Sequence, residues 1–213
     1  MDLFYSAKGG SGCSTIAAGF ALVAAKRTPT LLVDCAGNLD LLLGLRPGRV
    51  APDLGLTDWL GASDPPPDAL ARLERPITAG LSLLPFGRHG WDADAGRLQL
   101  LASLLAHDGR RSVVDVGGRF ADCAALASRA EQTVLVSRSC YLDLAAACNL
   151  PTPDALVLIM EAGRALRPGD FQAALGLRRS VVVAWDAKIA RSIDSGTAVA
   201  ELGRQLSDLT VLL

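Results

Sequence analysis

The chain has 213 residues, of which 50% are hydrophobic and only 5% aromatic, and its formal net charge is −1. This balance excludes a globally basic nucleic-acid binder, and the composition excludes a disordered chain, a collagen and a coiled coil. No apolar run reaches the ~20 residues that a membrane-spanning helix needs. The N-terminus lacks a basic segment followed by an apolar one, so we expect a cytoplasmic protein without a signal peptide. The length predicts a single domain over residues 1–213.

Short apolar runs alternate with longer segments of helical periodicity along the chain. In chain order, the apolar runs predict strands at residues 3–7, 30–35, 81–85, 112–116, 132–137, 155–160 and 180–185. The segments between them predict helices at residues 14–26, 54–60, 68–73, 92–107, 121–130, 141–148, 170–175, 187–194 and 198–209. The strands do not alternate polar with apolar residues, which is typical of strands covered on both faces. We therefore expect a three-layer α/β/α fold with a doubly wound, mostly parallel sheet.

The turn between the first predicted strand and the first predicted helix is rich in glycine. It contains Lys8, Gly9, Gly10, Ser11, Gly12, Cys13, Ser14 and Thr15. Its three glycines let the backbone curl with its N–H groups pointing inward, and the N-terminus of the following helix adds partial positive charge. The pattern predicts a phosphate-binding loop. A turn that merely connects strand and helix is the alternative interpretation.

The run from Lys8 to Thr15 resembles the deviant Walker A motif, KGGxGK[ST]T, of the MinD/ParA family of dimeric ATPases. The resemblance implies a P-loop that binds ATP and Mg, and a homodimer in which Lys8 reaches the partner's phosphates. The family's second lysine, which holds the β- and γ-phosphates, falls at Cys13 in this chain. A thiol is a weak and uncharged donor, so we expect weaker phosphate binding and still weaker stabilisation of the transition state.

Two aspartates follow predicted strands at positions that the same family uses. Asp34 resembles the first acidic residue of its D-x-D switch, while Ala36 stands where the family's second aspartate orients the attacking water. Asp115 lies in a segment that resembles the Walker B strand and switch II. The resemblance implies that Ser14, Asp34 and Asp115 hold Mg. A buried strand whose aspartate caps the next turn is the alternative interpretation of Asp115.

Two further segments extend the resemblance. Residues 37–45, GNLDLLLGL, are close to a stretch of the MinD/CpaE branch and, with the altered loop, suggest the divergent CpaE/TadZ-like branch of septum-site and pilus-positioning proteins. Residues 185–196 resemble the segment that follows the family's last strands. Glu161 stands where the family's adenine-reading asparagine is expected.

The five cysteines are odd in number and lack metal-binding spacings, so we expect reduced, mostly buried thiols. A redox-sensing Cys13, whose pKa a helix N-terminus would lower, is one alternative. An iron–sulfur reductase of the same superfold is another, but it would need a further cysteine between Cys35 and Cys123, where none occurs. The last third of the chain contains several arginines, which indicate either a solvated surface or a DNA-binding face. They are Arg164, Arg167, Arg178, Arg179, Arg191 and Arg204.

These observations predict a MinD/ParA-like spatial regulator or scaffold with weakened or lost ATP hydrolysis and residual nucleotide binding. We expect a homodimer that works with a protein partner of a pilus, secretion, division or partition system. We find no basic amphipathic tail in the sequence, so we expect no intrinsic membrane anchor. Two alternatives remain: an ATP-dependent dimerisation switch with slow ATPase activity, and a DNA-binding partition factor.

Overall fold

The structure is a computed structural model that describes residues 1–45, 54–63, 65–66 and 68–213. Its strands are β1 (Asp2–Tyr5), β2 (Thr30–Asp34), β3 (Arg75–Thr78), β4 (Leu81–Leu84), β5 (Arg111–Gly117), β6 (Gln132–Arg138), β7 (Ala155–Met160) and β8 (Ser180–Ala184). Its α-helices are α1 (Cys13–Ala24), α2 (Leu39–Leu42), α3 (Leu56–Gly61), α4 (Ala69–Arg72), α5 (Ala95–His107), α6 (Ala124–Ala127), α7 (Tyr141–Ala147), α8 (Pro168–Leu175), α9 (Ala187–Asp194) and α10 (Ala198–Gln205). Two 3₁₀ segments are η1 (Ala121–Cys123) and η2 (Ser207–Leu212).

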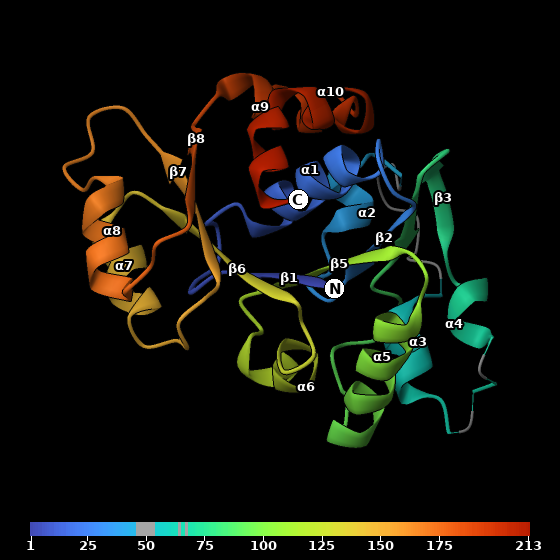
Figure 1. Cartoon of the computed structure of the whole chain (residues 1–213). Helices are drawn as coiled ribbons and strands as arrows, with labels where there is room; N and C mark the ends of the chain where they lie inside the picture. The colour runs from blue at the N-terminus through green and yellow to red at the C-terminus, as the bar shows by residue number, and fades with distance from the viewer. Residues whose placement is uncertain (46–53, 64, 67) are drawn as a thin grey trace.

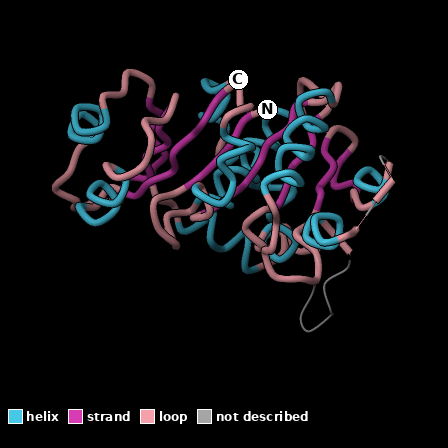
Figure 2. The backbone as a smooth tube through the Cα atoms, turned by 90° about the horizontal axis from the view of Figure 1, so that it is seen from below, coloured by secondary structure: helices cyan, strands magenta, loops and turns pink. Residues whose placement is uncertain are grey.

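The strands form one sheet in the order β3-β4-β2-β5-β1-β6-β7-β8. Neighbouring strands run parallel, except that β3 pairs antiparallel with β4 at one edge. Helices lie on both sides of the sheet, with α1, α9 and α10 on one face and α3, α5 and α6 on the other (Figure 1). Seen from below, the strands run side by side and helices cross in front of them (Figure 2). The predicted three-layer, doubly wound α/β fold is confirmed.

All the strands and helices that the sequence predicts are present, with ends that shift by a few residues. The predicted helix at 121–130 is shorter and begins as η1, and the predicted last helix stops at Gln205 and continues as η2. Two elements were not predicted: the four-residue helix α2 and the edge strand β3. Strand β3 lacks the continuous apolar run of its neighbours because it pairs on one side only and alternates half-buried with exposed residues.

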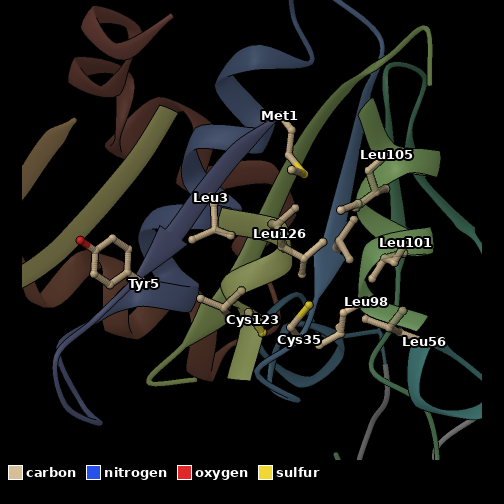
Figure 3. Packing of buried hydrophobic residues seen from close by; sticks show 14 of the residues in the cluster. Met1, Leu3, Tyr5, Cys35, Leu56, Leu98, Leu101, Leu105, Cys123 and Leu126 are labelled. Carbon is tan, nitrogen blue, oxygen red and sulfur yellow. The ribbon is translucent and has the colours of Figure 1, made fainter. Parts of the chain in front are cut away.

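Each face of the sheet carries its own hydrophobic core. Phe4 and Leu32 pack with α1 and α10 on one face, and Leu3 and Tyr5 pack with α5 and α6 on the other. Figure 3 shows the second core, in which Leu126 lies near the sulfur atoms of Cys35 and Cys123. Because successive residues of β1 enter opposite cores, the whole strand is buried. This explains why the apolar runs show no alternation.

The described cysteines are all free thiols, and three of the five are buried, as predicted. In the described part of the chain, no helix has both the length and the apolar character needed to cross a membrane.

The start of α3 is packed tightly against the loop that follows β4. The backbone N–H groups of Leu56 and Thr57 donate to the carbonyl oxygens of Pro85 and Phe86, at 2.8 and 2.7 Å. A Cβ atom on Gly55 would lie 2.3 Å from the Pro85 carbonyl oxygen. This position therefore has no room for a side chain.

We expect Gly55→Ala to lower the free energy of unfolding by about 1–3 kcal/mol, because backbone atoms must move apart to admit the methyl group. Gly61→Ala, at the other end of α3, is the matched control, since a Cβ there meets nothing within 4 Å. Urea denaturation of both variants and the wild type measures the difference. Equal stabilities of the two variants would contradict the packing described here.

Candidate functional site: a phosphate-binding loop

The loop between β1 and α1 curls around a cavity of about 500 Å³. Gly10 and Gly12 take left-handed backbone angles, with φ of 81° and 87°, which residues with a side chain rarely adopt. Gly12 caps the N-terminus of α1, and its carbonyl oxygen accepts from the N–H of Ile16 at 3.0 Å. The cavity is lined by Ser6, Gly9, Gly10, Ser11, Gly12, Cys13, Ser14, Thr15, Ala36, Asn38, Leu42, Val116, Gly117, Gly118 and Arg119. Loop amides beside a helix N-terminus are suited to phosphate oxygens.

Lys8 is held outside this cavity by a buried carboxylate that the sequence did not single out. Its Nζ lies 2.8 Å from Oδ1 of Asp143 in α7. The other carboxylate oxygen of Asp143 accepts from the Ser11 hydroxyl at 2.9 Å and from the backbone N–H of Arg138 at 2.8 Å. The Lys8 side chain remains 43% exposed, whereas that of Asp143 is 1% exposed. Asp143 thus anchors the loop to the segment that follows β6.

The Cys13 thiol donates to Oδ1 of Asp115 at 3.3 Å. Burial and the neighbouring Asp115 raise the pKa of Cys13 well above its usual value. The redox alternative supposed the opposite effect, a pKa lowered by the helix N-terminus. Its premise is therefore wrong: Cys13 is a buried thiol whose pKa is raised.

Asp34 and Asp115 are brought together by the register of two neighbouring parallel strands, in which they are direct partners. Asp34 accepts from the backbone N–H groups of Ala36, Gly37 and Leu39 at 3.0, 2.6 and 2.9 Å. Burial, followed by repulsion from Asp115, raises the pKa of Asp34 to about 7. Two buried carboxylates at one point thus favour a shared proton or a cation.

A divalent cation fits the residues beside this carboxylate pair. Oδ2 of Asp115 is buried and has no hydrogen-bond partner, while the nearby Ser14 side chain favours the charged form of Asp115 and so opposes the rise in its pKa. Mg²⁺ prefers such oxygen ligands and is commonly completed by water and phosphate. Ala36 lines the same cavity, at the position that the resemblance assigns to a water-orienting aspartate. Its methyl group has no hydrogen-bonding atom to offer.

A second cavity, of about 180 Å³, adjoins the first and shares Gly10, Ser11, Gly12 and Thr15 with it. Ile159, Trp185 and Ile189 give it mainly apolar walls, which suits the flat face of a base. Glu161, at the position of the expected asparagine, pairs instead with Arg138 and with Arg164, whose Nε lies 2.8 Å from the carboxylate.

The structure brings nearly all the predicted site residues together. Gly9 to Thr15 line one cavity, Ser14 lies near Asp115, and Asp34 lies beside Asp115. Lys8 is the exception, because Asp143 holds it away from the cavity wall. Asp143 and Arg119 were missed, since neither lies in the loop motif that drew attention. Their positions after strand ends, at the same edge of the sheet as the loop, were the available signal.

The arginines of the last third differ in their surroundings. Arg164 pairs with Glu161, and Arg204 pairs with Glu201. Arg179 donates to the Val211 carbonyl oxygen at 2.8 Å. These three side chains are at least partly engaged within the chain, which lends no support to a DNA-binding face.

Similarity to known proteins agrees with this geometry. No protein-family model matches the chain. Two uncharacterized Mycobacterium tuberculosis proteins, MT3760 and Rv3660c, are each 31% identical over 179 residues, which make up 78% of this chain and 48% of theirs. The chain therefore spans about half the length of these curated relatives.

Solved structures share the fold over nearly the whole chain. A ParA family ATPase from Chlorobium tepidum superposes with a TM-score of 0.78 at 22% identity, covering 99% of this chain and 95% of that one. MinD in the MinC:MinD complex of Aquifex aeolicus gives 0.77 at 18% identity, covering 99% and 93%. MinD from Pyrococcus horikoshii, complexed with Mg-ADP, gives 0.72 at 16% identity, covering 98% and 93%. The chain has the MinD/ParA P-loop fold.

The Asp143 contacts yield a stability prediction. We expect Asp143→Ala to lower the free energy of unfolding by about 2–4 kcal/mol, because it removes the buried acceptor that Ser11 and the Arg138 N–H share and that pairs with Lys8. We expect Lys8→Ala to cost under about 1 kcal/mol, because the ammonium is half exposed and screened by water. Chemical denaturation of both variants measures the contrast. Equal losses would contradict the anchoring role of Asp143.

The carboxylate pair yields a pH prediction. Between the unfolded pKa of Asp34, 3.8, and its folded value of about 7, the folded state binds more protons than the unfolded state. The stability of the metal-free protein therefore falls as the pH rises through this window. We expect Asp34→Asn to reduce this dependence in urea denaturation at pH 5 and pH 8. An unchanged slope would show that Asp34 titrates normally.

Proposed function

We propose that this chain is a MinD/ParA-like positioning protein that binds nucleotide weakly and hydrolyses ATP slowly or not at all. The observation that carries the proposal is the Cys13 thiol, which stands at the loop-lysine position and hydrogen-bonds to Asp115 at 3.3 Å. Phosphoryl transfer depends mainly on positioned charge, and this loop position supplies none. Ala36 removes the second chemically active position.

Residual nucleotide binding is expected because the rest of the cradle is intact. The loop residues and the first residues of α1 line the phosphate cavity, and the adjoining apolar cavity has room for part of a base. Ser14, Asp34 and Asp115 would hold Mg²⁺, which neutralises phosphate charge when bound. A phosphate cavity, a cation site and an adjoining apolar cavity together support ATP as the ligand.

A homodimer with a separate protein partner completes the proposal. Lys8 lies at the loop with 43% of its side chain exposed, so it remains accessible to a second copy. Asn38 and Leu42, from the segment that resembles the CpaE/TadZ-like branch, line the phosphate cavity, which would tie that segment to nucleotide binding. Pilus, secretion, division or partition machinery is the proposed target, and an intact slow ATP switch is the rival function.

Calorimetry with Mg-ADP, and a phosphate-release assay with Mg-ATP, separate the two functions. We expect the wild type to bind Mg-ADP at least about tenfold more weakly than Cys13→Lys, because the lysine restores a charge-assisted phosphate contact. Cys13→Ser is the matched control: it keeps a small neutral donor and should bind like the wild type.

Wild-type turnover that equals or exceeds that of Cys13→Lys would overturn the loss of hydrolysis. Tight wild-type binding, unchanged in Cys13→Lys, would overturn weakened binding. In either case the chain would be a working ATP switch.

A further inference from the structure

The phosphate cavity receives no cation from its own loop. The Cys13 side chain turns to Asp115, and the Lys8 ammonium lies 2.8 Å from Asp143 and outside the cavity wall. Backbone amides offer only partial charges, whereas a polyphosphate carries several full negative charges. A cation from elsewhere in the chain would therefore strengthen the binding of a polyphosphate.

Arg119 is placed to supply that charge. Of the described residues that line the cavity, only Arg119 has a charged side chain. It comes directly after Gly117 and Gly118 at the end of β5, in the segment that resembles switch II. Gly117 has a left-handed φ of 53°, and the Arg119 N–H donates to the Val116 carbonyl oxygen at 2.9 Å. This tight turn keeps Arg119 beside the loop.

Among the described residues, aromatic rings are what the guanidinium of Arg119 contacts. Its Cζ lies 6.0 Å from the centre of the Phe86 ring and 5.9 Å from that of Trp91. These two rings stack on each other at 6.4 Å. Within the described part of the chain, no carboxylate pairs with Arg119. Contacts of this length with aromatic faces are weaker than a forked, charge-assisted contact with phosphate, so a phosphate ligand can draw the side chain away.

We propose that Arg119 is the phosphate-binding cation of this site, and that it moves from Phe86 and Trp91 to the polyphosphate when a ligand binds. The guanidinium thus supplies, from within the same chain, the charge that Cys13 lacks. The inference rests on the proposed nucleotide binding and deepens it by assigning a residue to the phosphates.

Calorimetry with magnesium pyrophosphate and with Mg-ADP tests the assignment. We expect Arg119→Ala to weaken both ligands by at least about tenfold, and Arg119→Lys to lose less because it keeps the charge. Arg129→Ala is the matched control. Arg129 is an exposed arginine shortly after α6 that does not line the cavity, so its loss should leave both affinities unchanged.

Trp91 fluorescence provides an independent readout. Pyrophosphate has no base, so it leaves the surroundings of Trp185 in the second cavity empty. We expect pyrophosphate to change the emission of the wild type, and the change to be absent in Arg119→Ala and in Trp91→Phe. Trp91→Phe should still bind pyrophosphate in the calorimeter, since Trp91 does not line the cavity.

The outcomes separate this inference from the proposed function. If the wild type binds neither ligand, both are wrong. If the wild type binds and Arg119→Ala binds equally well, or if Trp91 emission does not respond to bound pyrophosphate, only the assignment of Arg119 is overturned. Stronger binding by the double variant Cys13→Lys/Arg119→Ala than by Arg119→Ala would support the view that both positions supply charge to the same phosphates.

Discussion

The candidate site depends on two carboxylates that share one buried point of the sheet. Asp34 and Asp115 end up as direct partners because β2 and β5 are parallel neighbours, and both are fully buried. Burying two like charges together costs free energy unless hydrogen bonds, protons or a cation offset it. Hydrogen bonds offset part of this cost. Three backbone N–H groups donate to Asp34, while the Gly117 N–H and the Cys13 thiol donate to Asp115.

This constraint gives Cys13 a structural role that its place in a loop motif conceals. A lysine at this position would bring a full positive charge near the pair, whereas the thiol brings only a weak hydrogen bond. The chain places its cations around the cavity instead: Lys8 on Asp143, and Arg119 over Phe86 and Trp91. The chain thus combines the MinD/ParA P-loop fold with a cavity whose cations lie at its margins.

The sequence was sufficient for the fold and for the position of the glycine-rich loop, because both depend on local patterns. Apolar runs identified seven strands, and the glycine spacing identified the loop. Strand β3 was not predicted, because a strand that pairs on one side only needs no apolar run. Asp143 and Arg119 were not predicted as site residues, because they come near the loop only when β5 and β6 lie beside β1. Even the direction of the Cys13 pKa shift depended on burial and on a partner 102 positions away, which no local pattern contains.

The central position of β1 also bears on how the chain folds. Asp2 pairs with Val113 on one side and with Gln132 on the other. The strand that leads into the phosphate loop therefore has no sheet neighbour until β5 and β6 have been synthesised, and closing such long segments slows folding. Until then, its apolar residues are open to other proteins. During synthesis, the strand that leads into the phosphate loop thus stays uncovered until β5 and β6 are made, and it is a natural target for chaperones.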